Sequence, residues 1–127
     1  MTQPPMGKIV WTDLTIPNAA QVRDFYAQVF GWKVQDIAVD EHTDFSMVDP
    51  ASGDAVVGVC HALGENATQP PQWINYFSVA NLEESIRVVE QNGGKVLTPV
   101  RGGAGWRFCV IQDPGGAVCG LMEMAGT

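Results

Sequence analysis

The chain has few of the residues that build metal centres, disulfide frameworks and nucleic-acid surfaces. It contains two histidines and three cysteines, and its 7 Lys and Arg against 14 Asp and Glu give a formal net charge of −7. A nucleic-acid partner needs a basic footprint, so this acidic chain is not expected to have one. An odd number of cysteines in apolar segments is typical of reduced, buried thiols and predicts a cytoplasmic protein.

Long apolar runs are also absent. No run approaches the length of a membrane span, so we expect no membrane partner. Residues 1–5 lack the basic and apolar regions of a signal peptide. The 127 residues suffice for a sizeable core, and we expect one domain over 1–127.

One short pattern occurs twice. Residues 49–59 and 113–121 both read as an Asp-Pro turn with glycine, followed by Ala-Val, one variable residue, glycine and an aliphatic residue. The two copies are separated by about half the chain, which is typical of a tandem of two supersecondary units. A protein built from two copies tends to place its site between them.

The sequence predicts the same order of elements in each half of the chain. Asn18 and Asn81 are expected to cap two helices. The first helix has one apolar stripe, formed by Val22, Phe25, Tyr26, Val29 and Phe30. Segments rich in β-branched residues, or bounded by turn signals, predict strands at 8–16, 32–39, 44–48, 55–60, 72–79, 95–100, 106–112 and 117–124. We therefore expect an α+β fold of two βαβββ modules, over 8–61 and 72–124.

Two such modules in a row, together with the string Asp-Phe-Tyr-Ala-Gln-Val-Phe-Gly-Trp at 24–32 and the Asp-Pro-x-Gly turn at 113–116, resemble the vicinal oxygen chelate superfamily. This group comprises glyoxalases, bleomycin resistance proteins and extradiol dioxygenases. The opening at 11–14 resembles its hydroxylase-like, glyoxalase-related branch. The resemblance implies a cup-shaped, eight-stranded mixed sheet and a homodimer.

Catalytic members of that group bind a divalent metal through four strand positions. Carried over, these positions fall on Trp11, Gly58, Ile74 and Gly120. None of the four side chains offers the oxygen or nitrogen donor that such an ion needs. We therefore expect no metal cofactor.

Strand alternation places Trp11, Ile74 and Tyr76 on the inner face of the implied cup. One interpretation is an aromatic pocket for a small organic ligand. The alternative is that the large side chains fill the cup as core. Gly58 and Gly120 slightly favour a pocket, since glycine inside a strand often marks close approach of a ligand or backbone.

Two charged residues are further candidates. Asp13 shares the face of Trp11 and could act as an acid or base, or bind a cationic group, or pair with Arg107. Arg107 could hold a ligand carboxylate through a bidentate contact. The alternative for Arg107 is a salt bridge at the rim, which contributes little.

The two histidines, His42 and His61, lack the spacing of metal ligands. A metal site would have to combine one of them with Glu65, Asp44 or Glu123. The preferred interpretation is two surface histidines.

The leading functional prediction is a small-molecule binding protein of the glyoxalase and bleomycin-resistance type without a metal centre. The alternative is an enzyme of the lyase, isomerase or dioxygenase type. It would be either independent of metal, with Asp13 as acid or base, or supplied with a metal by ligands other than those of the family.

Overall fold

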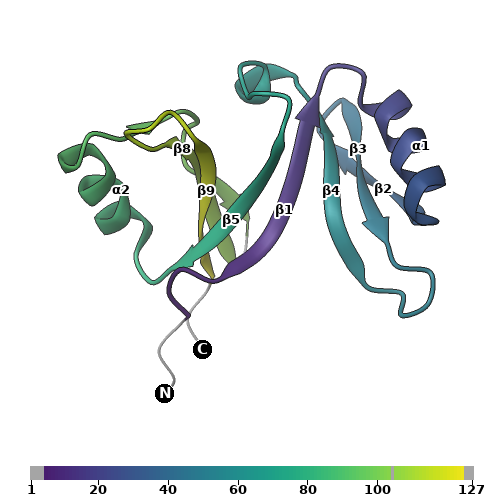
Figure 1. Cartoon of the computed structure of the whole chain (residues 1–127), viewed down its shortest axis with the longest axis horizontal. Coiled ribbons are helices and arrows are strands. Elements are labelled where there is room, and N and C mark those ends of the chain that lie inside the picture. The colour runs from purple at the N-terminus through teal and green to yellow at the C-terminus, as the bar shows by residue number, and fades with distance from the viewer. Residues whose placement is uncertain (1–4, 104, 125–127) are drawn as a thin grey trace. The chain divides into compact units, whose positions relative to one another are not determined.

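The computed structural model describes residues 5–103 and 105–124. It divides into two compact parts, which we call the N-terminal part (Thr12–Trp73) and the C-terminal part (Met1–Trp11 with Ile74–Thr127). Among the described residues each part has one α-helix and a mixed set of strands (Figure 1).

The N-terminal part contains α1 and four neighbouring strands in the order β2-β3-β4-β1. β1 and β4 run parallel, whereas the other neighbours are antiparallel. A short 3-10 helix, η1 (Gly64–Asn66), follows β4. The other elements are β1 (Ile9–Ile16), α1 (Ala19–Phe30), β2 (Lys33–Val39), β3 (His42–Val48) and β4 (Ala55–His61).

The C-terminal part repeats this plan with α2 and strands in the order β5-β9-β8-β6. β5 and β9 run parallel, and β7 pairs with β8. The elements are β5 (Trp73–Val79), α2 (Leu82–Gln91), β6 (Lys95–Val96), β7 (Arg101–Gly103), β8 (Trp106–Gln112) and β9 (Val118–Met124). The predicted α+β class and the two βαβββ modules are confirmed.

The pairing register confirms the internal repeat. In the parallel ladder of the first module Gly58 lies beside Asp13, and in the second Gly120 lies beside Tyr76. Asp13 comes two residues after Trp11, and Tyr76 comes two residues after Ile74, the position that corresponds to Trp11 in the second module. The two copies therefore have matching registers, as the sequence predicts.

The repeated Asp-Pro turns use the same hydrogen bonds. The Asp49 carboxylate accepts from the backbone N–H of Ala51 at 2.8 Å, and the Asp113 carboxylate accepts from that of Gly115 at 2.8 Å. Each turn closes on a glycine of positive φ, Gly53 at 78° and Gly116 at 92°. Side-chain acceptance by the Asp stabilises such turns, and glycine tolerates the left-handed conformation.

The predicted strand over 95–100 is wrong in its extent. The structure has β6 at Lys95–Val96 and a separate β7 at Arg101–Gly103. Between them Thr98 is buried, and its hydroxyl accepts from the backbone N–H of Val110 at 3.0 Å. Pro99 has no N–H to give to a ladder. A side chain thus occupies the N–H that a continuous strand would have bonded.

The C-terminal part is apolar on both faces of its strands. One cluster, with Leu82, Cys109 and Leu121, packs under α2. The other cluster, on the opposite face, is built on Ile74, Tyr76 and Val110. We call this second surface the aromatic face. The residues packed around its centre are Trp11, Leu97, Phe108, Val118 and Met122.

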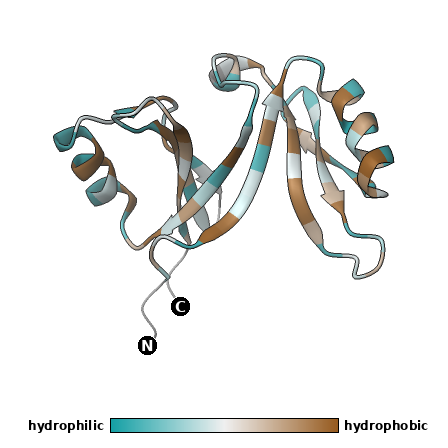
Figure 2. Ribbon diagram, viewed as in Figure 1, coloured by the Kyte–Doolittle hydropathy of each residue, from teal (hydrophilic) through white to brown (hydrophobic). Residues whose placement is uncertain are grey.

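In the N-terminal part α1 packs through its small residues. Ala19 and Ala27 contact the cluster of Phe45, Met47 and Val59. The apolar stripe predicted to define the buried face is largely exposed instead, with Phe25 at 58%, Val29 at 55% and Phe30 at 57%. Figure 2 shows hydrophobic residues recurring along α1.

The N-terminal ends of α1 and α2 are capped differently. The Asn81 side chain accepts from the backbone N–H of Glu84 at 3.0 Å, as predicted for a cap. Asn18 makes no such bond; its amide donates to the Gln21 side chain at 3.1 Å. The expected N-cap of α1 is therefore not formed by the Asn18 side chain.

Replacing Gly120 with alanine is expected to destabilise the C-terminal part. An added Cβ would overlap the ring of Tyr76, which is 2% exposed and has little room to move. Such overpacking typically costs about 1–3 kcal/mol. Urea unfolding of Gly120→Ala should show this loss. Gly115→Ala, where the nearest atom is an Asp113 oxygen at 3.3 Å, is the control. Equal midpoints for the two variants would contradict the contact.

Candidate functional site

The centre of the aromatic face is the Tyr76 ring lying against Gly120. The two residues are neighbours in the parallel β5/β9 ladder. Ile74 and Tyr76 are 0% and 2% exposed, so they form the interior of this face. The glycine at position 120 is explained by the ring that covers it.

Around this centre lie aromatic side chains that are more accessible. Phe108 meets Tyr76 edge to face with ring centroids 5.7 Å apart. Trp106 stacks on Phe108 at 5.2 Å and is 43% exposed. Trp11 packs against the same cluster and is half-buried. Flat apolar surfaces of this kind suit planar or aliphatic ligand groups.

Arg101 adds a positive charge to the aromatic face. Its guanidinium carbon lies 4.8 Å from the centre of the Phe108 ring. Arg101 and Phe108 are direct partners in the antiparallel β7/β8 ladder, so both side chains project from the same face. The side chain is half-buried, which strengthens a cation–π contact. Our sequence reasoning did not select this arginine.

Gly102 allows this approach. Its φ is 157°, and an added Cβ would overlap the backbone of Trp106 and Arg107. A side chain at position 102 would force β7 away from β8 and lift Arg101 from the ring. The glycine-rich stretch after Arg101 was a usable sequence signal for this close approach of two backbones.

In the N-terminal part the predicted site residues form a different, polar group. Gly58 of β4 lies between Asp13 of β1 and Ser46 of β3. Gly58 is buried and Asp13 half-buried. The strands thus hold a carboxylate next to a residue without a side chain.

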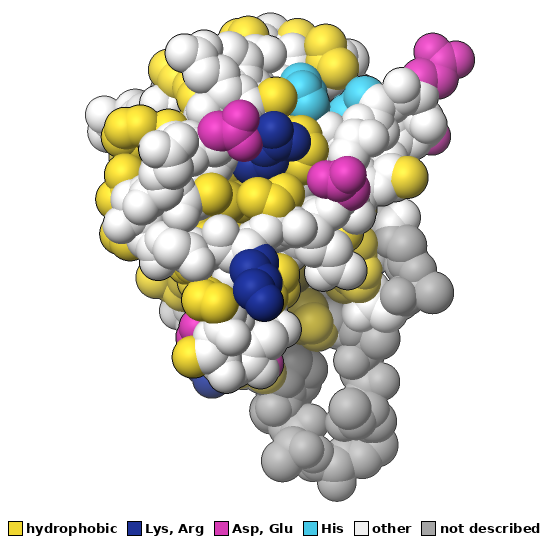
Figure 3. All heavy atoms as spheres, turned by 90° about the vertical axis from the view of Figure 1, so that its right-hand side faces the viewer, with side chains coloured by type: hydrophobic (Ala, Val, Ile, Leu, Met, Phe, Trp, Pro, Cys, Tyr) yellow, Lys and Arg dark blue, Asp and Glu magenta, His cyan; other side chains and the backbone are white. Residues whose placement is uncertain are grey.

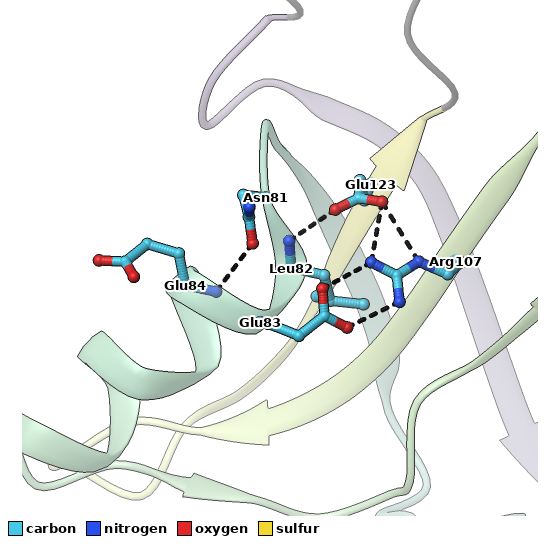
Figure 4. Close-up of polar contacts among 6 residues, drawn as sticks. All are labelled: Asn81, Leu82, Glu83, Glu84, Arg107 and Glu123. Atoms are coloured by element: carbon cyan, nitrogen blue, oxygen red, sulfur yellow. Dashed lines mark hydrogen bonds and ion pairs between the residues drawn. The ribbon is translucent and has the colours of Figure 1, made fainter.

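Arg107 lies on the opposite face of β8 from Arg101. Its guanidinium holds Glu83 of α2 through two hydrogen bonds of 2.7 Å and Glu123 of β9 at 2.9 Å (Figure 4). The other Glu123 oxygen accepts from the backbone N–H of Leu82 at 2.7 Å. Arg107 therefore forms the salt bridge that was the alternative interpretation of this residue, and its partners are Glu83 and Glu123. This network ties the start of α2 to the sheet.

The network shifts the pKa values of Glu83 and Arg107 in the stabilising direction. Hydrogen bonds from Arg107 lower the pKa of Glu83 below its ordinary value of 4.5. Hydrogen bonds to Glu83 and then to Glu123 raise the pKa of Arg107 above its ordinary range. These shifts follow from structural ion pairing at the surface and give Arg107 a role in stability.

The two histidines come together at one carboxylate. His42 Nε2 lies 3.2 Å and His61 Nδ1 lies 3.4 Å from Asp44 Oδ1, and the His61 backbone N–H donates to the same oxygen at 2.9 Å. Asp44 is 8% exposed, and both rings are half-buried. Both rings thus remain partly exposed, and the structure adds their shared contact with Asp44 to the interpretation of two surface histidines. Because Asp44 is 17 residues from His61 in sequence, strand pairing was needed to bring them together.

The residues at the four positions that the resemblance assigns to metal ligands do not fit a divalent ion. Trp11 and Ile74 carry no metal donor, and the Tyr76 ring occupies the space beside Gly120. Within residues 5–103 and 105–124, no group of three or more His, Cys, Asp or Glu side chains is arranged to hold a metal. Of the carboxylates considered with the histidines, Asp44 contacts both, Glu123 belongs to the Arg107 network, and the Glu65 side chain lies outside the described residues.

The cysteines are free thiols. Burial raises the pKa of Cys109 to about 11, and it also raises the pKa of Cys119. A thiol that stays protonated at neutral pH is a poor nucleophile. These two cysteines therefore act as small apolar side chains, as the sequence predicts. No helix in the described segments is long and apolar enough to span a membrane.

A family model described as the Glyoxalase/Bleomycin resistance protein/Dioxygenase superfamily matches residues 8–119. A Mycobacterium bovis protein named "Putative glyoxylase CFP32" is 30% identical over 116 residues, covering 89% of this chain and 44% of that protein. The anthracycline biosynthesis protein DnrV of Streptomyces peucetius is 30% identical over 146 residues, covering 98% and 52%. The chain thus spans about half the length of these relatives.

Solved structures with the same fold include methylmalonyl-CoA epimerase from Mycobacterium tuberculosis, with a TM-score of 0.61 and 16% identity over 99% of this chain and 93% of that one. A Streptomyces coelicolor methylmalonyl-CoA epimerase variant in complex with 2-nitronate-propionyl-CoA has a TM-score of 0.61 and 17% identity, covering 96% and 100%. At such identities the likeness shows the fold alone.

Removing the Glu83 carboxylate should reduce the amount of folding stability that the protein loses as the pH falls. Because the folded-state pKa of Glu83 lies below 4.5, its ion pair stabilises the fold above that pH and is lost as the pH falls below it. Glu83→Gln should therefore lose less stability than the parent chain between about pH 5 and pH 3. The effect should be small because the pair is exposed. Thermal unfolding measured against pH gives the slope, and Glu90→Gln on the same helix is the control. Parallel profiles for the parent and Glu83→Gln would show that the pair contributes nothing.

Proposed function

Because the chain belongs to the Glyoxalase/Bleomycin resistance protein/Dioxygenase superfamily, we propose that it binds a small organic ligand on the aromatic face, without a metal ion. The observation that carries the proposal is the Arg101 guanidinium stacked on Phe108 beside the exposed Trp106. This arrangement offers a flat apolar surface and a positive charge next to each other.

The chemistry of this surface favours a ligand with a planar or aliphatic body and an anionic group. The aromatic rings would contact the body of the ligand. A guanidinium presents five N–H donors, and Arg107 holds two carboxylates at once. We propose that Arg101 likewise contacts a ligand oxyanion while its guanidinium lies on Phe108.

The candidate residues have different roles in this proposal. Trp11 is a wall of the surface, whereas Ile74, Tyr76 and Gly120 form its interior. Arg107 is left out because it lies on the helix face and binds Glu83 and Glu123. Gly58 and Asp13 stay candidate ligand contacts of the N-terminal part.

The enzyme alternative rests on Asp13. Its carboxylate is half-buried in β1 beside Gly58, and partial burial can adapt a carboxyl group to proton transfer. Solved structures of this fold include epimerases. In this alternative Asp13 takes or gives a proton of a substrate bound in the N-terminal part.

A cytoplasmic location and a homodimer belong to the same proposal. Three free cysteines support the first. Three exposed apolar side chains of α1, Phe25, Val29 and Phe30, support the second.

A pair of dyes tests the binding surface. N-phenyl-1-naphthylamine and 8-anilinonaphthalene-1-sulfonate share one apolar body, and the second adds a sulfonate. Arg101→Gln should weaken binding of the sulfonate dye by about tenfold or more, the loss expected for a charge-assisted hydrogen bond. Binding of the neutral dye should change by less than about twofold, because the rings remain. Fluorescence titration gives both dissociation constants.

Arg87→Gln is the matched control, since it removes the same charge from an exposed site on α2. It should leave both affinities unchanged. If neither dye binds to the parent chain, the binding proposal is wrong. If Arg101→Gln affects both dyes equally, the aromatic face binds ligands but Arg101 does not recognise the anion.

The proposal also predicts protein without a tightly bound metal. Elemental analysis of the chain purified without chelator should show no stoichiometric Zn, Ni, Fe or Mn, because the four family positions carry no donor side chain. One equivalent of metal that disappears in His42→Ala or His61→Ala would contradict this. It would move the functional centre to the histidine pair.

A further inference from the structure

One carboxylate of the N-terminal part has two imidazole rings as neighbours. Asp44 Oδ1 lies 3.2 Å from His42 Nε2 and 3.4 Å from His61 Nδ1. The centroids of the two rings are 5.7 Å apart. Figure 3 shows histidine side chains at the surface of this side of the molecule, close to a lysine or arginine. We call these three residues the His-Asp-His cluster; neither the binding proposal nor the acid–base alternative uses it.

The cluster joins two strands beyond the end of their ladder. β3 and β4 pair from Phe45 with Val59 to Val48 with Ala55. Just before Phe45, the Asp44 carboxylate accepts from the backbone N–H of His61 at 2.9 Å. A side chain thus takes the place of a strand carbonyl as the acceptor. The last residue of β4 is therefore held to β3 through a charged group.

The contact between His42 and Asp44 depends on charge. His42 Nε2 is buried and, within the described part of the chain, makes no hydrogen bond of suitable geometry, although Asp44 Oδ1 is 3.2 Å away. Asp44 is only 8% exposed, and a buried carboxylate needs a compensating charge or hydrogen bonds. A first proton on either ring makes the cluster neutral, which favours the closed arrangement.

A second proton has no second carboxylate to face. With both rings protonated, one negative and two positive charges share the cluster, and the positive rings repel one another across 5.7 Å. Histidine is the side chain that ordinarily changes its charge between about pH 5 and pH 8. The count of protons on the cluster therefore changes within this range.

The helix beside the cluster adds to the positive charge. The Arg23 guanidinium of α1 lies 4.5 Å from the centre of the Phe45 ring. That ring is in turn 5.8 Å from the His61 ring. Arg23 therefore opposes the uptake of a second proton on this side of the cluster, although its ion pair with the exposed Asp24 weakens the effect.

The other neighbours supply little negative charge. Asp40 and Glu41, on the turn before His42, are exposed, so water and salt screen them. Cys60, a thiol, precedes His61, and the side chain of Glu65 in η1 lies outside the described residues. The residues that pair with the cluster in β2 and β1 are uncharged: Ile37, Val39 and Ile16.

The internal repeat shows that the fold does not require such a cluster. Counted back from the two Asp-Pro turns, Asp44 corresponds to Phe108 and His42 to Trp106. In the second module these positions carry two aromatic rings stacked at 5.2 Å. The same two strand positions thus hold an apolar contact in one module and a charged one in the other. Only the charged one responds to protons.

We propose that the His-Asp-His cluster is a pH-sensitive clasp between β3 and the end of β4. One proton holds the clasp closed, and a second proton opens it. Ser46 follows Asp44 by two residues, and Gly58 precedes His61 by three. Opening therefore loosens the two strands that hold Gly58 between Ser46 and Asp13. The N-terminal part would in this way lose its polar group of candidate contacts in acid.

Hydrogen exchange of the His61 amide, measured by NMR, tests the clasp without any ligand. Its protection, the ratio of the unstructured to the observed exchange rate at each pH, should fall at least about threefold between about pH 6.5 and pH 5. Repulsion between two unit charges at the observed ring separation gives this factor even in water. The Val110 amide, bonded to the Thr98 hydroxyl in the C-terminal part, is the internal reference and should keep its protection.

Variants separate the two-proton mechanism from a general acid effect. His42→Gln leaves one imidazole with Asp44, so the protection of the His61 amide should not fall over the same range. Asp44→Asn keeps an oxygen that can accept the His61 N–H but removes the negative charge, so its protection should fall at a higher pH than in the parent chain. Asp36→Asn removes an exposed carboxylate from the neighbouring strand and should behave like the parent.

A titration of the parent chain keeps the test independent of the folding of any variant. The ring signals of both histidines should follow one shared two-step curve, as expected for interacting groups. Two independent single-step curves would overturn the proposal. It would also be overturned by unchanged protection of the His61 amide in the parent, by a parent-like fall in folded His42→Gln, or by an equal fall at the Val110 amide. Circular dichroism shows whether each variant is folded.

Discussion

The contact of the Tyr76 ring with Gly120 is the constraint on which the C-terminal part depends. The ring can lie there because position 120 has no side chain and because the parallel β5/β9 ladder places the two residues side by side. Phe108 then packs against the edge of Tyr76, and Trp106 and Arg101 stack on Phe108. A side chain at position 120 would occupy the place of the ring, so this packing requires the glycine.

The same β8 strand separates two arginines with different roles. Arg107, on the helix face, is held by two carboxylates and secures the start of α2. Arg101 reaches the opposite face from β7 and lies on an aromatic ring. A guanidinium stacked on a half-buried ring keeps its charge near an apolar surface, which suits recognition of an anionic organic molecule. The binding proposal rests on this second arginine.

Much of the fold could be predicted from the sequence because the chain repeats itself. The two Asp-Pro turns, the glycines near the ends of the modules and the alternation along the strands predicted both βαβββ units and the equivalence of Trp11 with Ile74. Alternation could also have placed Arg107, which shares its face with Cys109 and Ile111.

Other features depend on contacts that periodicity does not contain. The 3.6-residue period showed that Phe25, Val29 and Phe30 share a side of α1, but it could not show that Ala19 and Ala27 pack on the sheet instead. The histidines meet at Asp44 through strand pairing between distant residues. The break between β6 and β7 follows from the hydroxyl of Thr98, which accepts the Val110 N–H.

The four tryptophans allow the most direct test of ligand binding on the aromatic face. Trp11 and Trp106 belong to the C-terminal part, whereas Trp32 and Trp73 pack in the core of the N-terminal part. Their indole N–H signals can be followed by two-dimensional NMR while 8-anilinonaphthalene-1-sulfonate is added. The account predicts that the signals of Trp11 and Trp106 shift in a saturable way and that those of Trp32 and Trp73 stay in place. Shifts confined to Trp32 and Trp73, or no shift at any of the four, would contradict it.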